Sequence, residues 1–177
     1  MENFETILAN EREAAERRAY IDGPNTICSS SPVTYKYDPM PANHQWSAST
    51  NLSYSSSTTG TFVVTATGSG YGWIRVVDSN NNTVAIKYIW IGVPAVGMSG
   101  QQLVYSGNTT QYSATNNTDA FITSYQWMIS PQGSNVIYDY GSWVSIYFPN
   151  TGNFRVSVRA QNACGWSSWY DYYVDVI

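Results

Sequence analysis

The sequence predicts an all-β protein in which two small β-sandwiches follow one short N-terminal α-helix. Three observations lead to this prediction. After residue 24, short runs of β-branched and aromatic residues alternate with clusters of Gly, Ser, Asn and Asp. These runs fall into two blocks that resemble each other. The first 22 residues instead carry apolar side chains at helical spacing.

Residues 2–20 are expected to form the helix. Phe4, Ile7 and Leu8 follow the i, i+3, i+4 spacing of one helix face, and Gly23 and Pro24 follow the helix where it ends. The apolar stripe is thin, so a helix of this length would be marginal alone in water. We therefore expect Phe4, Ile7 and Leu8 to dock on a protein partner or on a second copy of the chain. A connector or frayed tail is the alternative.

The strands expected in the first block are residues 61–67, 73–77 and 85–91, with turns at 68–70 and 78–82. In the second block they are residues 111–115, 124–129, 136–140, 144–148, 154–160 and 169–176. Turn signals about every ten residues are typical of a sandwich or barrel.

The two blocks share local patterns. Gln45-Trp46 matches Gln126-Trp127, and residues 72–76 (GWIRV) match residues 152–156 (GNFRV), in both cases about 80 residues apart. A tryptophan on an early central strand packs between the two sheets of immunoglobulin-like folds, and Trp46 and Trp127 are expected in that role. Unrelated aromatic coincidences are the alternative. The predicted division is a helix or linker at 1–22, a first domain at 23–94 and a second at 95–177.

Longer runs resemble a known family. Residues 21–28 (IDGPNTIC) and 88–94 (YIWIGVP) look like the start and end of immunoglobulin-like repeats of bacterial secreted and surface proteins. Residues 148–165 (FPNTGNFRVSVRAQNACG) resemble the related PKD-like repeats. The resemblance implies two tandem immunoglobulin-like domains. It does not select a function, because such modules serve as spacers, adhesin stalks, carbohydrate binders and virion decorations.

The resemblance also bears on the two cysteines. In similar repeats, a cysteine on the first strand pairs with one in the last hairpin of the same domain. Cys28 and Cys164 occupy these two positions, but each lacks a partner within its own repeat. The sequence therefore favours two free thiols over a disulfide bond between them.

Charge and composition argue against several function classes. Only 11% of the residues are charged, and the five bases after residue 23 are matched by six acids, so we expect no nucleic-acid binding. No apolar run is long enough to insert into a membrane, and the acidic first residues do not read as a signal peptide. The single histidine, His44, has only Asp38 as a nearby acid, and two separated cysteines make no zinc set. No enzyme, cofactor or metal is expected. Asp78 with its neighbouring asparagines reads as a turn, with a calcium loop as the less favoured alternative.

Aromatic side chains are the one excess, at 15% of the chain. We expect about half of them to be exposed and to form a protein interface or a sugar-stacking platform. Ordinary packing of these side chains within the fold, without a binding role, is the alternative. The candidate binding-surface residues are Tyr138, Tyr140, Trp143, Trp166, Trp169 and Tyr170.

The expected function is a non-catalytic structural or adhesive module, docked through its helix. Its expected location is extracellular, on a cell surface or on a virion exterior. The alternative is a carbohydrate-binding accessory domain of a secreted enzyme.

Overall fold

The computed structural model describes residues 20–38, 40, 42–58, 60–116 and 120–177. The helix expected at residues 2–20, with Phe4, Ile7 and Leu8, lies outside the described residues except for Tyr20. The chain divides into two compact units, the first ending at Gly92 and the second running from Val93 to Ile177. All the named elements are strands, which confirms the all-β prediction.

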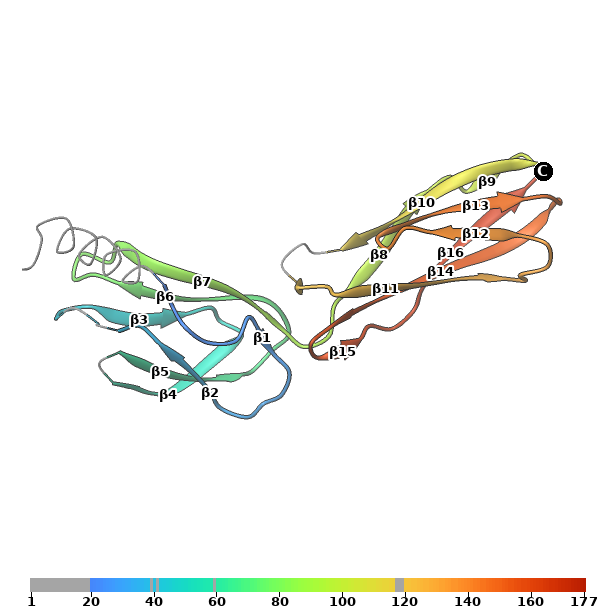
Figure 1. Ribbon diagram of the computed structural model, residues 1–177. Helices are drawn as coiled ribbons and strands as arrows, with labels where there is room; N and C mark the ends of the chain where they lie inside the picture. Colours follow the sequence, from blue (N-terminus) through green and yellow to red (C-terminus); the bar gives the residue numbers. More distant parts are fainter. Residues whose placement is uncertain (1–19, 39, 41, 59, 117–119) are drawn as a thin grey trace, which may run out of the picture. The chain divides into compact units, whose positions relative to one another are not determined.

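The first unit consists of two sheets with a core between them (Figure 1). One sheet has the order β1 (Thr26–Ile27), β7 (Thr83–Ile91), β6 (Gly70–Val77), β3 (Gln45–Ala48). The other has the order β2 (Val33–Lys36), β5 (Thr61–Ala66), β4 (Leu52–Thr58). Phe62 and Val64 of β5 meet Ile74 and Ile89 of the larger sheet in one buried cluster.

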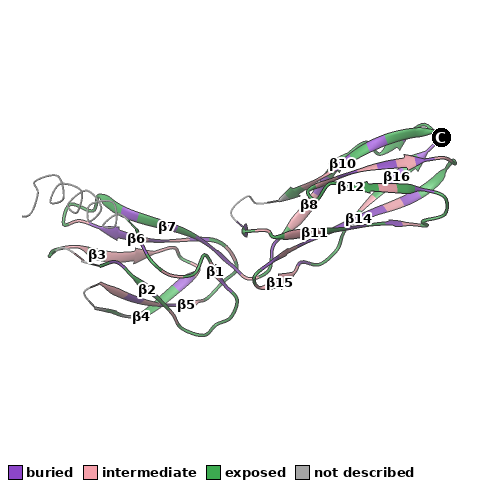
Figure 2. Ribbon diagram, viewed as in Figure 1, coloured by how far each residue is buried: buried purple, intermediate pink, exposed green. Residues whose placement is uncertain are grey.

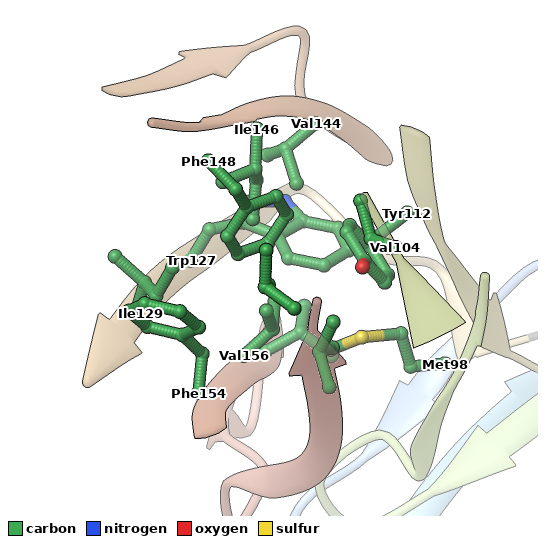
Figure 3. Close-up of a cluster of buried hydrophobic side chains, with 13 residues drawn as sticks. Met98, Val104, Tyr112, Trp127, Ile129, Val144, Ile146, Phe148, Phe154 and Val156 are labelled. Carbon is green, nitrogen blue, oxygen red and sulfur yellow. The ribbon is translucent and has the colours of Figure 1, made fainter. Parts of the chain in front are cut away.

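The second unit has the same plan. One sheet has the order β11 (Ser124–Ser130), β14 (Gly152–Asn162), β16 (Tyr170–Val176), β9 (Leu103–Val104), with β15 (Gly165–Trp166) paired to β14. The other has the order β12 (Val136–Asp139), β13 (Trp143–Phe148), β10 (Asn108–Asn116), β8 (Val96–Gly100). Read in chain order, these strands give the two sheets of a constant-type immunoglobulin fold. Figure 3 shows side chains of both sheets converging in the core, including Tyr112, Trp127 and Phe148.

A buried tyrosine holds the start of each unit in place. The hydroxyl of Tyr35 on β2 donates a hydrogen bond of 3.0 Å to the carbonyl of Pro24, eleven residues earlier. Tyr112 on β10 makes the same bond, also 3.0 Å long and across eleven residues, to Gln101. Both rings are completely buried. Each ring lies so close to the preceding glycine, Gly23 or Gly100, that a Cβ atom there would overlap with it.

This contact sits where the chain changes sheets. In the second unit, β8 pairs with β10 and β9 pairs with β16 of the opposite sheet. In the first unit, Asp22 bridges to Lys36 of β2, and β1 then pairs with β7. The strands β1 and β9 both run parallel to the last strand of their unit. The tyrosine therefore fixes the crossing in both units.

The strand register corrects the alignment of the two repeats. Gly70 lies opposite Ile91, where β7 meets β1, and Gly152 lies opposite Val176, where β16 meets β9. Gly152 therefore corresponds to Gly70 and not to Gly72, as the matching runs had suggested. Both glycines have a positive φ, 91° for Gly70 and 146° for Gly152. The error is two residues, which leaves every side chain on its face because the strand period is two.

The expectation of two free thiols is wrong. Neither Cys28 nor Cys164 is a free cysteine, and both are disulfide-bonded. Sequence spacing shows which repeat a cysteine belongs to. A disulfide depends on the distance between Cα atoms, which spacing does not determine.

The contact between Tyr112 and Gly100 can be tested by adding one methyl group. We expect Gly100→Ala to lower the free energy of unfolding by about 1–3 kcal/mol, because the added Cβ overpacks the buried ring. Urea denaturation measures the change, with the exposed neighbour Ser99→Ala as the control. Equal stability of the two variants would contradict this role of Gly100.

The buried phenols also predict a loss of stability in alkali. Burial raises the pKa of Tyr35 and of Tyr112 well above its ordinary value of about 10. The unfolded chain therefore loses these protons first, so stability is intact below pH ~10 and falls as the pH rises further. Urea denaturation across this range should show the fall. The double variant with Tyr35→Phe and Tyr112→Phe should show a shallower one, and an identical fall would contradict the assignment.

Candidate binding faces

The six aromatic residues expected to form a binding surface lie on two different sheets. Tyr138, Tyr140 and Trp143 belong to the β12–β13 hairpin, where the rings of Tyr140 and Trp143 stack with centroids 4.1 Å apart. Trp166, Trp169 and Tyr170 belong to the segment around β15 and β16 of the opposite sheet. They therefore do not form a single platform.

Trp166 and Trp169 flank one guanidinium group on the outer face of their sheet. The Arg159 guanidinium carbon lies 4.7 Å from the centroid of each indole ring. Its Nε donates a hydrogen bond of 2.8 Å to the side-chain oxygen of Gln126 on β11. Tyr170 lies on the opposite face, because it pairs with Val158, whose side chain is in the core.

The two tryptophans expected in the cores occupy equivalent strands. Trp127 on β11 is 9% exposed, and its Nε1 donates a hydrogen bond of 2.8 Å to the carbonyl of Gly141 between β12 and β13. Trp46 on β3 is half-buried and stacks on Phe62 of the facing sheet, with centroids 5.1 Å apart.

The first unit carries an exposed aromatic surface that was not predicted from the sequence. On β6, the core-facing residues alternate with Tyr71, Trp73 and Arg75, which therefore point outward. Their partners on β7 include Tyr88 opposite Trp73 and Ile86 opposite Arg75. We call these five residues the aromatic face. Figure 2 shows exposed residues alternating with buried ones along β7.

The aromatic face is internally ordered. The rings of Tyr71 and Tyr88 stack with centroids 5.7 Å apart, and the Arg75 guanidinium lies 4.8 Å from the Trp73 ring. Tyr71 is nevertheless 40% exposed and Tyr88 48%. The period-two pattern was readable in the sequence. It could not show which side is outward, because both sides of these strands are rich in apolar residues.

The equivalent place in the second unit is a polar hollow of about 510 Å³. The register makes Asn153 the counterpart of Tyr71, Arg155 the counterpart of Trp73, and Tyr173 the counterpart of Tyr88. Asp175 likewise stands where the first unit has Trp90. The lining of the hollow comes from three adjacent strands and consists of Ser130, Asn153, Phe154, Arg155, Tyr173 and Asp175.

A short polar network borders this hollow. Asp171 accepts a hydrogen bond of 2.6 Å from the hydroxyl of Ser157 and lies 3.5 Å from an Nη of Arg155. The Arg155 side chain is still 41% exposed. Arg155 is therefore oriented by Asp171 while its guanidinium stays accessible from the hollow.

The acid singled out as a possible calcium ligand caps a turn. Asp78 accepts hydrogen bonds from the backbone N–H groups of Asn80 and Asn82, at 2.9 and 2.8 Å, and from the Asn82 side chain. The bonds from Asn82 lower the pKa of Asp78.

His44 has its Nδ1 3.2 Å from the carbonyl oxygen of Ala42 in its own loop. Across the described ranges, three or more His, Cys, Asp or Glu side chains nowhere gather in a metal-binding group. No described helix has the length and apolarity to span a membrane.

No protein-family model matches the chain. Karilysin of Tannerella forsythia is 29% identical over 181 residues, a match that covers 89% of this chain and 38% of Karilysin. The D00-D0 domain of intimin has 13% identity and a TM-score of 0.41, covering 88% of this chain and 96% of that one. The ectodomain of mouse nectin-like molecule 4 has 11% identity and a TM-score of 0.44, covering 90% and 64%.

The contacts of Arg159 predict a measurable structural role. We expect Arg159→Gln to lower the free energy of unfolding by about 1–2 kcal/mol, because two cation–π contacts are lost together. The near-UV circular dichroism of tryptophan should change as well. Lys36→Gln, which removes an exposed cation from β2, is the control. A variant that matches this control in both measurements would contradict the role of Arg159.

Proposed function

We propose that this chain is a non-catalytic structural or adhesive module of a larger assembly outside the cell, such as a bacterial surface structure or a phage particle. In this proposal it docks through its N-terminal segment. The observation that carries it is the aromatic face of the first unit. Large rings on the solvent side of a sheet are typical of surfaces that contact another polypeptide.

The state of the cysteines supports an exterior location. Both Cys28 and Cys164 are disulfide-bonded, and structural disulfides persist in oxidising compartments. The abundance of neutral hydroxyl and amide side chains, with only 11% charged residues, fits the same setting. The proposed location is therefore extracellular, on a cell surface or on a virion.

Residues 1–19 are the occupant that we propose for the aromatic face. The described chain begins at Tyr20, whose ring lies 5.1 Å from the Lys87 ammonium group and whose hydroxyl is 3.4 Å from it. Lys87 lies on β7 between Ile86 and Tyr88, two members of the face, but its buried side chain points to the other side of the sheet. The N-terminal segment therefore starts beside β7. To reach the face, the segment would pass around the edge of β7, which β1 pairs only at Trp90 and Ile91.

Length, polarity and charge also match. A helix of residues 1–19 would be about 28 Å long, and the nine residues of β7 span about 30 Å. Phe4, Ile7 and Leu8 supply the apolar stripe that would cover the rings. The segment carries five glutamates against three arginines, which suits the Arg75 cation of the face. Packing on the same chain would seal the face, and packing on a second copy would join two modules.

Changing the face and removing the segment should each disturb the other partner of the contact. We expect Tyr88→Glu to shift the NMR resonances of Phe4, Ile7 and Leu8, and a chain starting at Tyr20 to shift those of Trp73 and Ile86, because each change removes the contact between the segment and the face. Light scattering after size exclusion identifies the donor. A fall in mass in both variants means that the segment of a second copy covers the face, and an unchanged mass means that the chain's own segment does.

The matched control is Tyr138→Glu, because Tyr138 is 51% exposed and lies on the β12 strand of the second unit. The truncation starts at Tyr20 and not later, because Ile21 is 1% exposed and belongs to the core. If removing residues 1–19 leaves both the resonances and the mass unchanged, packing of this segment on the aromatic face is refuted.

A further inference from the structure

The polar hollow of the second unit has the composition of a ligand site. One of its lining residues is Tyr173, which is 66% exposed. The polar residues Asn153, Arg155, Asp175 and Ser130, which come from three neighbouring strands, line it as well. An apolar surface with a few convergent polar groups is the usual construction of a small-molecule site.

The two units show that this hollow is not a property of the fold alone. At the corresponding positions the first unit has the rings of Tyr71, Trp73 and Trp90 in place of Asn153, Arg155 and Asp175. Only the tyrosine is shared, as Tyr88 and Tyr173. The same backbone thus carries aromatic side chains at these positions in the first unit, where Trp90 is buried, and a polar hollow beside one ring in the second.

The polar groups point to a neutral, hydroxyl-rich ligand. Arg155 donates only, Asp175 accepts only, and Asn153 and Ser130 do both. Hydroxyl groups also do both, so they can pair with every one of these side chains. The site does not favour an anion, because Arg155 is already paired with the carboxylate of Asp171 and a second carboxylate, that of Asp175, lines the hollow. A pyranose ring has an apolar C–H face for the tyrosine and hydroxyl groups around its rim.

We propose that the hollow bounded by Tyr173, Arg155 and Asp175 binds one residue of a neutral oligosaccharide. The sugar ring stacks on Tyr173, and its hydroxyl groups exchange hydrogen bonds with Arg155, Asp175 and Asn153. This site lies in the second unit and does not depend on the docking of residues 1–19. It develops the carbohydrate-binding function that the sequence left as an alternative.

The test is an NMR titration of the full chain with cellohexaose, mannohexaose, xylohexaose and maltohexaose. We expect at least one of them to shift the amide resonances of Asn153, Arg155 and Tyr173 with millimolar affinity, as befits a single subsite. Tyr173→Ala should weaken this binding at least about tenfold, the effect of losing one stacking contact. Tyr173→Phe keeps the ring and should bind within about threefold of the unchanged chain.

Tyr105→Ala is the matched control, because Tyr105 is also 66% exposed but lies on the loop between β9 and β10. It should bind the sugar like the unchanged chain. The proposal is overturned if none of the four sugars shifts these resonances, or if Tyr173→Ala binds as well as Tyr105→Ala. Hexalysine tests the alternative that the hollow binds a cationic peptide, since a tyrosine ring beside carboxylates also attracts cations. Shifts with hexalysine and with no sugar would also overturn it.

Discussion

Each sandwich depends on a tyrosine that ties the first segment of the unit to both sheets. Tyr35 and Tyr112 are completely buried, and each bonds a carbonyl eleven residues earlier. The glycine beneath each ring allows the close approach, and the bonded carbonyl belongs to the residue after that glycine. On one side of this point the chain pairs with the strand that carries the tyrosine, and on the other it pairs with the last strand. The core between the sheets is closed by this crossing.

Because the crossing and the core fix the backbone, the outer faces can differ in chemistry without a change of fold. The shared tyrosine, Tyr88 or Tyr173, lies beside Trp73 in the first unit and beside Arg155 in the second. Exposed side chains at such positions contribute little to the core, so they can vary while the fold is kept. The two units therefore present different outer surfaces on one architecture.

Much of the fold was readable from the sequence, and the candidate sites much less so. The strands at 61–67 and 154–160 were visible because period-two alternation and turn residues are local signals. The two-residue strands β1 and β9 were not, since a parallel pairing with the last strand leaves no local pattern. The repeat was recognised, but its predicted register was wrong by two residues. The matching runs GWIRV and GNFRV align Gly72 with Gly152, whereas the strand pairing makes Gly70 the counterpart of Gly152.

The sequence by itself determined the strand segments, the turns and the kinship of the two repeats, because these follow from the chemistry of neighbouring residues. Only the tertiary structure decided which residues meet. Tyr138 and Trp169 were both candidates for an exposed aromatic binding surface, yet Tyr138 lies on β12 and Trp169 directly precedes β16, a strand of the opposite sheet. Arg159 gathers two tryptophans that the sequence showed only as near neighbours of each other. The physical reason is that strand pairing joins residues far apart in the chain, and the core chooses which side of each strand faces water.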